Sequence, residues 1–292
     1  MDKKIVLGVD IGGSHITSAL IDIEKAVLIE ESIVRKAVDS GGTVEEIIEV
    51  WCATMAQSLS SQPIQEKYIG IAMPGPFNYA EGISHIAEQT KYRSLYGLNL
   101  KHLLGEKLGI PQENILFEND ACCFLLGECF AGAAQKKQSL VGLTLGTGLG
   151  SAIYNNGIVK DAELWEYPFK QSIAEDYLST KWFVNQYFKL YGEKLSGVKE
   201  ILAQTNYGVP VKEIFEEFGN NLGEFITAIP AENRFDEIVI GGNIAKAADY
   251  FLPSTVKYLE KAEFDVKINI GILGENAAIM GAAGIFNSHF AR

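Results

Sequence analysis

The chain carries two glycine-rich turns of a kind that binds phosphate groups. One turn spans residues 10–14 and the other spans residues 145–150, and each joins two apolar runs that read as strands. Glycine tolerates φ > 0 and lets the backbone approach an anion closely, so successive N–H groups can converge on phosphate oxygens. Two such turns in one chain predict two walls of one nucleotide-binding cleft.

The first turn also offers a metal ligand, because Asp10 stands at the end of its leading strand. A carboxylate there can hold Mg²⁺ directly or through water while the turn holds the phosphates. Neither turn has the Gly-Lys-Ser/Thr ending of a Walker loop, and a ligand-free hairpin would also select these glycines. The residues expected to contact phosphate are Gly12, Gly13, Ser14, Gly146, Thr147 and Gly148.

Asn119 and Asp120, at the start of a predicted helix, are the candidates for the chemical step. A sugar hydroxyl is a poor nucleophile until a base takes its proton, and a positioned carboxylate such as Asp120 can act as that base. Both residue types are also common helix caps, so a purely structural role is the alternative. Their place between the two phosphate turns favours the catalytic interpretation.

Two further loops follow buried strands. Pro74-Gly75-Pro76 ends the strand predicted over 68–73, and ligands of open α/β sheets bind at the carboxyl ends of strands. Gly241 and Gly242 follow the strand predicted over 237–240 and would bring the backbone close to a flat ligand such as adenine. A left-handed turn before a helix is the alternative for this second loop.

The elements that must position these residues alternate between strands and helices, as in an α/β protein. In the first half we expect strands at 4–9, 16–23, 27–35, 68–73 and 114–117, and helices at 43–59, 97–109 and 119–134. In the second half we expect strands at 139–145, 149–155, 237–240 and 266–272, and helices at 176–191, 196–204, 209–228, 244–260 and 276–288. Thr43, followed by Glu46, predicts a capping box, and the aromatic stripe over 182–191 predicts core packing.

Length and charge narrow the class further. A chain of 292 residues favours two domains. Twenty-five Lys and Arg against thirty-seven Asp and Glu give a net charge of −12, which argues against nucleic acid or an anionic membrane as the main partner. The four cysteines form no Cys-x-x-Cys pair, so they predict no metal or redox motif. The chain has no signal-like or membrane-spanning apolar run, and we expect a cytoplasmic protein.

With these residues in place, the chain resembles the ROK family, the bacterial sugar kinases of the actin-like ATPase superfamily. The resemblance covers nearly the whole chain and implies two ribonuclease H-like α/β domains with a cleft between them. The N-terminal domain would span 1–118, with the C-terminal helix at 276–292 able to complete it, and the C-terminal domain would span 119–275. The motifs that carry the resemblance are Asp-Ile-Gly-Gly-Ser at 10–14, Gly-Ile-Ala-Met-Pro-Gly-Pro at 70–76, Asn-Asp-Ala at 119–121, Leu-Gly-Thr-Gly-Leu-Gly at 145–150 and Ile-Gly-Gly-Asn at 240–243.

The resemblance implies transfer of the ATP γ-phosphate, with Mg²⁺, to a hydroxyl of a hexose, usually O6. Asp120 would be the general base, Asn119 would bind a neighbouring hydroxyl, Gly75 would line the sugar pocket and Asp10 would serve the metal. The partners would be a small sugar and a nucleotide, and a homodimer is expected because the family is often dimeric. Some family members are repressors with a helix-turn-helix domain, but the first predicted strand begins at residue 4, so we expect no nucleic-acid or membrane partner.

The segment after the second turn departs from the family pattern. Members normally carry Glu-x-Gly-His, then a cysteine-rich zinc motif and a further glutamate. Here Glu163 and Glu175 keep the two carboxylates, Glu166 stands at the histidine position and Trp165 replaces the glycine. The zinc cysteines are missing from the sequence, so no structural zinc is expected. We expect all three glutamates to contact the sugar and, because a carboxylate only accepts hydrogen bonds, an altered sugar specificity.

The sequence therefore predicts a kinase for a hexose or a hexose derivative. A glucokinase that uses polyphosphate is one alternative, since short members without the zinc motif include such enzymes. A catalytically weak sugar sensor, or pseudokinase, is another, because the family histidine is absent. The presence of both Asp10 and Asp120 favours an active kinase.

Overall fold

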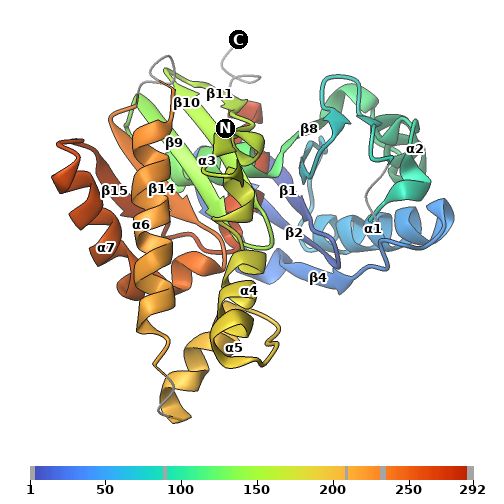
Figure 1. Cartoon of the computed structure of the whole chain (residues 1–292). Coiled ribbons are helices and arrows are strands. Elements are labelled where there is room, and N and C mark those ends of the chain that lie inside the picture. The colour runs from blue at the N-terminus through green and yellow to red at the C-terminus, as the bar shows by residue number, and fades with distance from the viewer. Residues whose placement is uncertain (1–3, 88–90, 208–209, 231–234, 288–292) are drawn as a thin grey trace. The chain divides into compact units, whose positions relative to one another are not determined.

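A computed structural model describes residues 4–87, 91–207, 210–230 and 235–287 (Figure 1). The chain divides into two compact units. Unit 1 contains the segment up to Lys136 together with the segment from Glu275 onward, and unit 2 contains residues 137–274. Each unit is built on one mixed β-sheet.

The sheet of unit 1 has an antiparallel part and a parallel part. β1 pairs antiparallel with β2, while β5 pairs parallel with both β1 and β8, and β3 and β4 both pair with β2. The strands, in sheet order, are β3 (Val27–Leu28), β2 (His15–Asp22), β1 (Ile5–Ile11), β5 (Ile69–Met73) and β8 (Ile115–Asn119), with β4 (Val34–Ala37) beside β2.

The sheet of unit 2 repeats the order of β3, β2, β1, β5 and β8 in unit 1, and it has five strands where the sheet of unit 1 has six. Its central hairpin β9–β10 is antiparallel, and β14 pairs parallel with both β9 and β15. The strands, in sheet order, are β11 (Ile158–Asp161), β10 (Leu149–Asn155), β9 (Ser139–Leu145), β14 (Glu237–Gly241) and β15 (Lys267–Ile270). The two glycine turns thus connect equivalent strand pairs, as expected of a duplicated ribonuclease H-like unit.

Helices complete both units. Unit 1 contains α1 (Val44–Leu59), α2 (Leu100–Leu108), α3 (Asp120–Ala131) and α8 (Asn276–Gly284), and unit 2 contains α4 (Thr180–Tyr191), α5 (Val198–Ala203), α6 (Lys212–Ala228) and α7 (Ala248–Lys261). Short hairpins are formed by β6 (Phe77–Asn78) with β7 (Ile83–Ser84) and by β12 (Pro168–Phe169) with β13 (Ser172–Ile173). No helix in the described ranges has both the length and the apolar character needed to span a bilayer.

α1 begins at the predicted capping box and covers one face of the first sheet. Thr43 Oγ1 accepts the N–H of Glu46 at 3.3 Å, and Glu46 Oε2 accepts the N–H of Thr43 at 2.8 Å, which confirms the prediction. The buried face of the helix includes Trp51 and Met55, which join the core formed by the odd-numbered residues of β1. The even-numbered residues of β1 face the other side, because side chains alternate along a strand.

α8 covers that other side at backbone contact distance. A Cβ built on Gly8 of β1 or on Gly70 of β5 would overlap the backbone oxygen of Ile279 or Ala282 of α8. α3 packs against α8 in the same way, and the nearest approach there joins Gly281 to the carbonyl of Cys123. Because α3 packs on α8, the boundary of unit 1 lies after Lys136, beyond the position expected from the sequence.

The core of unit 2 is aromatic. Trp182, Phe183 and Tyr187 of α4 are buried, and the Phe183 ring lies 4.5 Å from that of Phe218 of α6. Phe188 and Tyr191, from the same predicted stripe, are exposed at 52% and 38%. The core interpretation therefore holds for the first part of the stripe and is wrong for Phe188, which faces solvent. Tyr191 lies on the same face of the helix as Tyr187, and their rings pack 4.7 Å apart at the partly exposed end of α4.

Several predicted elements differ from the structure. The strand predicted over 27–35 is interrupted by a 3-10 turn at Glu30–Ser32, because Ser32 Oγ bonds the carbonyl of Ile29 and receives the N–H of Leu20. The helix predicted from 176 begins at Thr180, after a separate turn at Ala174–Asp176. The helix predicted over 276–288 ends at Gly284, and residue 288 lies outside the described residues.

The glycine contacts of α8 give a stability prediction. Gly281→Ala should lower the free energy of unfolding by about 2–3 kcal/mol, because the added methyl would overlap the backbone of Cys123. Gly284→Ala is the matched control in the same helix, since its methyl would meet only Phe130 at an ordinary 3.8 Å. Urea unfolding measures both variants. Equal stability of the two would contradict the close packing of α3 and α8.

Candidate functional site

The two glycine turns are hairpin connections of different length. In unit 1 the last strand pair is Ile11 with Ile16, and the N–H of Gly12 bonds the carbonyl of His15 at 2.9 Å. In unit 2 the last pair is Leu145 with Leu149, so the second turn is one residue shorter. This difference explains why the hydroxyl of Thr147 falls one place earlier in its turn than the hydroxyl of Ser14.

The carbonyls of the first turn are held by neighbouring elements. The Tyr92 hydroxyl donates to the carbonyl of Gly12 at 2.6 Å, and the Ser40 hydroxyl donates to the carbonyl of Gly13 at 2.8 Å. In a planar trans peptide the N–H points opposite to the C=O. The N–H groups of Gly13 and Ser14 therefore point away from Tyr92 and Ser40, as an anion-binding turn requires.

Tyr92 is a residue that the sequence did not reveal. It is fully buried, has a left-handed backbone with φ of 58°, and packs edge to face on Trp51 at 5.3 Å. Burial raises the pKa of its phenol above the ordinary value, and the nearby Asp10 raises it further, so the hydroxyl stays protonated and donates. No local motif marks such a contact, because Tyr92 meets Gly12 across 80 residues of chain.

Asp10 lies on the face of the first sheet that α8 covers, together with other charged groups. It pairs in register with Thr17, which pairs with Arg35 of β4, so the three lie in one row. Arg35 donates to the Glu275 carboxylate at 2.8 Å. Burial raises the pKa of Asp10 to about 6; the Asp120 carboxylate also raises it, Arg35 lowers it and Glu275 raises it.

Asn119 and Asp120 occupy the junction of β8 and α3. Asn119 Oδ1 caps the helix by accepting the N–H groups of Ala121 at 2.8 Å and Cys122 at 3.2 Å. The structural alternative thus holds for the Asn119 oxygen, and its role with a sugar stays a prediction. Asp120 is exposed at the first position of the helix, and one of its oxygens accepts the N–H of Ala121.

Tyr79 joins this junction to the Pro-Gly-Pro loop and was also missed from the sequence. Its hydroxyl accepts a hydrogen bond from Asn119 Nδ2 at 3.3 Å and donates one to the carbonyl of Met73 at 3.1 Å. A methyl built on Gly75 would lie 3.3 Å from the same hydroxyl, and the Gly75–Pro76 peptide bond is cis. In unit 1 the structure therefore brings together the first turn, Gly75, Asn119 and Asp120 at the carboxyl ends of β1, β5 and β8.

The second turn is held in a different way. The carbonyl of Gly146 receives both the N–H and the hydroxyl of Thr180 at 2.8 Å, so the N–H of Thr147 points away from α4. Glu175 Oε2 accepts the N–H of Leu149 at 3.0 Å, and its carboxylate lies against Gly148. In this structure Glu175 thus forms a hydrogen bond with the second turn, and its contact with a sugar stays a prediction.

Gly242 reaches the same turn from β14. It has φ of +85°, and a Cβ there would overlap the backbone of Leu145. The left-handed turn that the sequence left open is therefore present, and it is followed by a 3-10 segment at Ile244–Ala247 before α7. Unit 2 thus brings together Gly146, Thr147, Gly148, Glu175, Gly241 and Gly242.

The segment from Glu163 to Glu166 forms a short 3-10 turn on unit 2. Leu164 is buried and its N–H bonds Ser151 Oγ at 2.9 Å, which fixes the turn to β10. Glu163 adopts a left-handed backbone with φ of 49°. Trp165, at 42% exposure, and Glu166 both face solvent. The turn presents these two departures from the family pattern at the surface of the unit.

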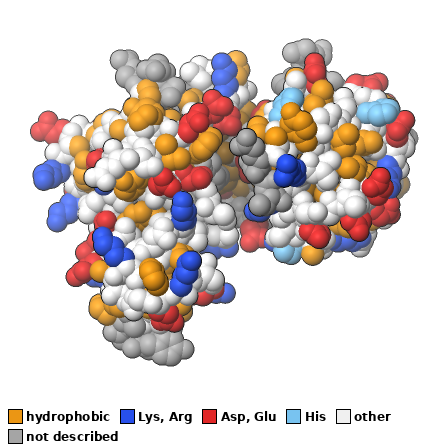
Figure 2. Space-filling view, turned by 45° about the vertical axis from the view of Figure 1, so that its right-hand side comes forward, with side chains coloured by type: hydrophobic (Ala, Val, Ile, Leu, Met, Phe, Trp, Pro, Cys, Tyr) orange, Lys and Arg blue, Asp and Glu red, His pale blue; other side chains and the backbone are white. Residues whose placement is uncertain are grey.

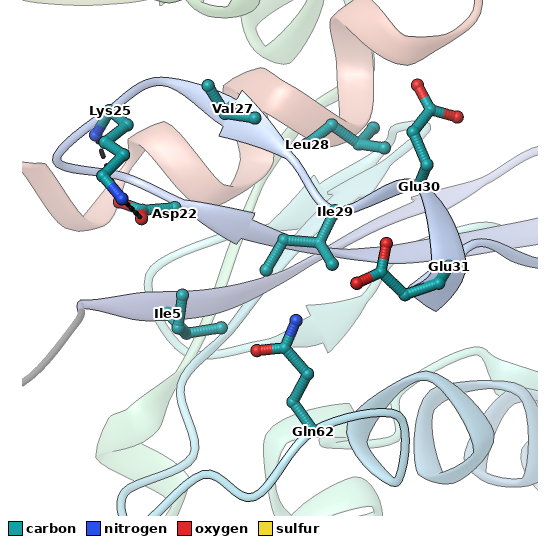
Figure 3. Close-up of a pocket in the computed structure, with 9 residues that line it drawn as sticks. All are labelled: Ile5, Asp22, Lys25, Val27, Leu28, Ile29, Glu30, Glu31 and Gln62. Carbon is teal, nitrogen blue, oxygen red and sulfur yellow. Dashed lines mark hydrogen bonds and ion pairs between the residues drawn. The ribbon is translucent and has the colours of Figure 1, made fainter.

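A separate hollow in unit 1 lies away from these residues. This hollow has a volume of about 320 Å³, and its lining residues, which include Ile5, Asp22 and Lys25, are drawn in Figure 3. Ile5 begins β1 and Asp10 is five residues further along it, so the two are about 17 Å apart in an extended strand. Asp22 already accepts the N–H of Lys25 at 3.1 Å and pairs with its ammonium. The hollow therefore lies apart from Asp10 and the first glycine turn.

More than half of the chain matches the model of a known family. The model of the ROK family matches residues 6–161, more than half of the chain. The chain belongs to the ROK family. It is 26% identical to an N-acetyl-D-glucosamine kinase from Mannheimia succiniciproducens, a match that covers 97% of this chain and 99% of that protein. It is 27% identical to a glucokinase from Thermotoga maritima over 54% of this chain and 46% of that protein.

Solved ROK structures share the fold. A ROK family glucokinase from Streptomyces griseus, in complex with glucose and AMPPNP, superposes with a TM-score of 0.77 at 22% identity and covers 96% of this chain and 98% of that one. The ROK protein described here therefore has the actin-like ATPase fold of two ribonuclease H-like units, as the resemblance implied. The likeness to these structures establishes the fold alone.

The raised pKa of Asp10 predicts a pH-dependent stability difference. An unfolded aspartate loses its proton near pH 4 and the folded Asp10 near pH 6, so charging Asp10 destabilises the folded wild type as the pH rises through this window. Asp10→Asn should match the wild type at pH 4 and exceed its free energy of unfolding by up to about 2–3 kcal/mol at pH 7. Urea unfolding at both pH values measures the difference. A constant difference would contradict the assignment.

Proposed function

We propose that this ROK family protein is an ATP-dependent carbohydrate kinase that phosphorylates the O6 hydroxyl of a hexose or hexose derivative. The supporting observation is the meeting of the first turn, Asp10 and Asp120 at one edge of the unit 1 sheet. Family membership and the relatives that phosphorylate sugars point to the same chemistry. The overall negative charge argues against a polyanionic polymer as acceptor. The Lys and Arg side chains on the face in Figure 2 are scattered, without one basic patch.

In the proposed reaction Asp120 is the general base. A sugar hydroxyl attacks the γ-phosphorus, the bond from phosphorus to the β,γ-bridging oxygen breaks, and ADP leaves. The hydroxyl proton passes to the Asp120 carboxylate. Asp120 is exposed and stands at the N-terminus of α3, where the helix dipole stabilises a carboxylate. The N–H groups of Gly13 and Ser14 hold phosphate oxygens during the transfer.

Asp10 fits the proposed role of metal ligand. Its carboxylate has a raised pKa and carboxylate neighbours, so a divalent cation would stabilise its charged form. The described residues hold no cluster of three or more metal-binding side chains, so Asp10 with water and phosphate oxygens is the expected ligand set for Mg²⁺. When bound, Mg²⁺ neutralises charge on the phosphates.

The acceptor pocket is proposed to differ from that of a glucose kinase. Glu166, at the position of the family histidine, only accepts hydrogen bonds, and Trp165 beside it is bulky where the family has glycine. Both face solvent from the 3-10 turn of unit 2. Glu166 can accept a hydrogen bond from a donor on the sugar, such as a 2-amino group. It cannot donate a hydrogen bond to a sugar that must accept one from the protein at this position.

The base assignment is tested by Asp120→Asn. This variant should lower kcat by at least about a hundredfold while leaving the sugar Kd within about threefold, because an amide cannot take the hydroxyl proton. The assay couples ADP release to NADH oxidation over neutral, amino and N-acetylated hexoses, with ATP and with polyphosphate as donors. Asp249→Asn, an exposed aspartate of α7, is the control and should keep full activity. A normal kcat for Asp120→Asn would refute the assignment.

The specificity proposal is tested at Glu166. Glu166→His should raise kcat/KM for glucose by about tenfold, since a hydrogen-bond donor becomes available to the sugar. Glu166→Gln removes the negative charge without introducing an imidazole ring, so it separates the effect of the charge from the effect of the ring. The same coupled assay reports both variants. Wild-type glucose efficiency equal to that of a dedicated glucokinase would overturn the proposal.

A further inference from the structure

Lys91 places a cation on the first glycine turn. The atoms nearest to the position of a Cβ on Gly13 are Nζ, Cδ and Cε of Lys91, with Cδ and Cε at 2.6 Å. Only a glycine leaves room for a lysine side chain to lie this close to the turn. The turn and Lys91 come from segments almost 80 residues apart in sequence, so nothing in the local motif indicates the contact.

The backbone next to Lys91 is fixed. Tyr92 is fully buried, its N–H bonds the carbonyl of Ser40 at 2.6 Å, and its hydroxyl bonds the carbonyl of Gly12 at 2.6 Å. Ser40 in turn donates to the carbonyl of Gly13. Tyr92 and Ser40 therefore hold the Lys91 backbone and the turn in one hydrogen-bonded assembly, while the Lys91 side chain itself is exposed.

Carboxylates near the turn carry negative charge that a cation can offset. The Asp120 and Glu275 carboxylates both act on Asp10 as negative charges, and the nearby Arg35 is paired with Glu275. A nucleotide triphosphate would bring further negative charge to this edge, and the charge on a phosphoryl group in transfer is spread over its three equatorial oxygens. An ammonium against Gly13 lies where it can offset that charge.

We propose that Lys91 donates N–H hydrogen bonds to the phosphoryl group during its transfer and is thus a catalytic residue. This proposal rests on the proposed kinase function. The P–O bond to ADP breaks and the P–O bond to the sugar forms, as described above, and the hydroxyl proton still goes to Asp120. Lys91 keeps its own protons throughout and stabilises charge on the equatorial oxygens.

The test compares Lys91→Met, which keeps an apolar stem over Gly13, with Lys91→Arg, which keeps the charge. With the best sugar of the panel, Lys91→Met should lower kcat by at least about thirtyfold and change the sugar KM by less than about threefold. Lys91→Arg should recover much of the loss. Lys67→Ala, an exposed lysine before the amino end of β5, is the control and should behave as the wild type. Urea unfolding verifies that each variant is folded.

Two results would overturn the proposal. If kcat of Lys91→Met lay within twofold of the wild type, Lys91 would only pack against Gly13. If the sugar KM alone rose, Lys91 would bind the sugar and not the phosphoryl group. If the wild type phosphorylates no sugar, the kinase proposal fails separately. Calorimetric binding of Mg²⁺ with AMPPNP then decides on Lys91: at least about tenfold weaker binding by Lys91→Met supports a phosphate contact, and equal binding refutes it.

Discussion

Parallel pairing of β5 with both β1 and β8 is the constraint on which the candidate site depends. The registers Asp10 to Ala72 and Met73 to Asn119 bring three strand ends to one edge of the sheet. Since parallel strands end on the same side, Asp10, the Pro-Gly-Pro loop and the candidate base meet there although they are far apart in sequence. The hairpin β1–β2 adds the glycine turn at the same edge, and unit 2 repeats this arrangement with β14 and β9.

This edge concentrates negative charge, and its positive partners come from elsewhere in the chain. Arg35 reaches the row of Asp10 from β4, and Lys91 reaches Gly13 from the loop before α2. The family pattern explains the carboxylates and the glycines, but it supplies neither of these two cations. The balance of charge at the turn thus also depends on residues outside the quoted family motifs.

The sequence was sufficient for the elements and for the groups that follow strands. The glycine turns, the capping box of α1 and the duplicated strand order could all be predicted, because each depends on local residue types or on a repeated pattern. Tyr79, Tyr92 and Lys91 could not, since each acts across a long stretch of chain from a loop without periodicity. The contact of Glu175 with a sugar stays a prediction. Its hydrogen bond with the N–H of Leu149 in the second turn could not be predicted, because that contact depends on the path of the backbone.

The division of unit 1 into two segments has a consequence for synthesis of the chain. Residues 137–274 form unit 2 as one continuous segment, whereas unit 1 needs α8, which follows unit 2 in the chain. Until then Gly8 and Gly70 leave the α8 face of the first sheet uncovered, with no side chain to shield its backbone. During translation, therefore, unit 1 begins before unit 2 but cannot be completed until unit 2 has been made.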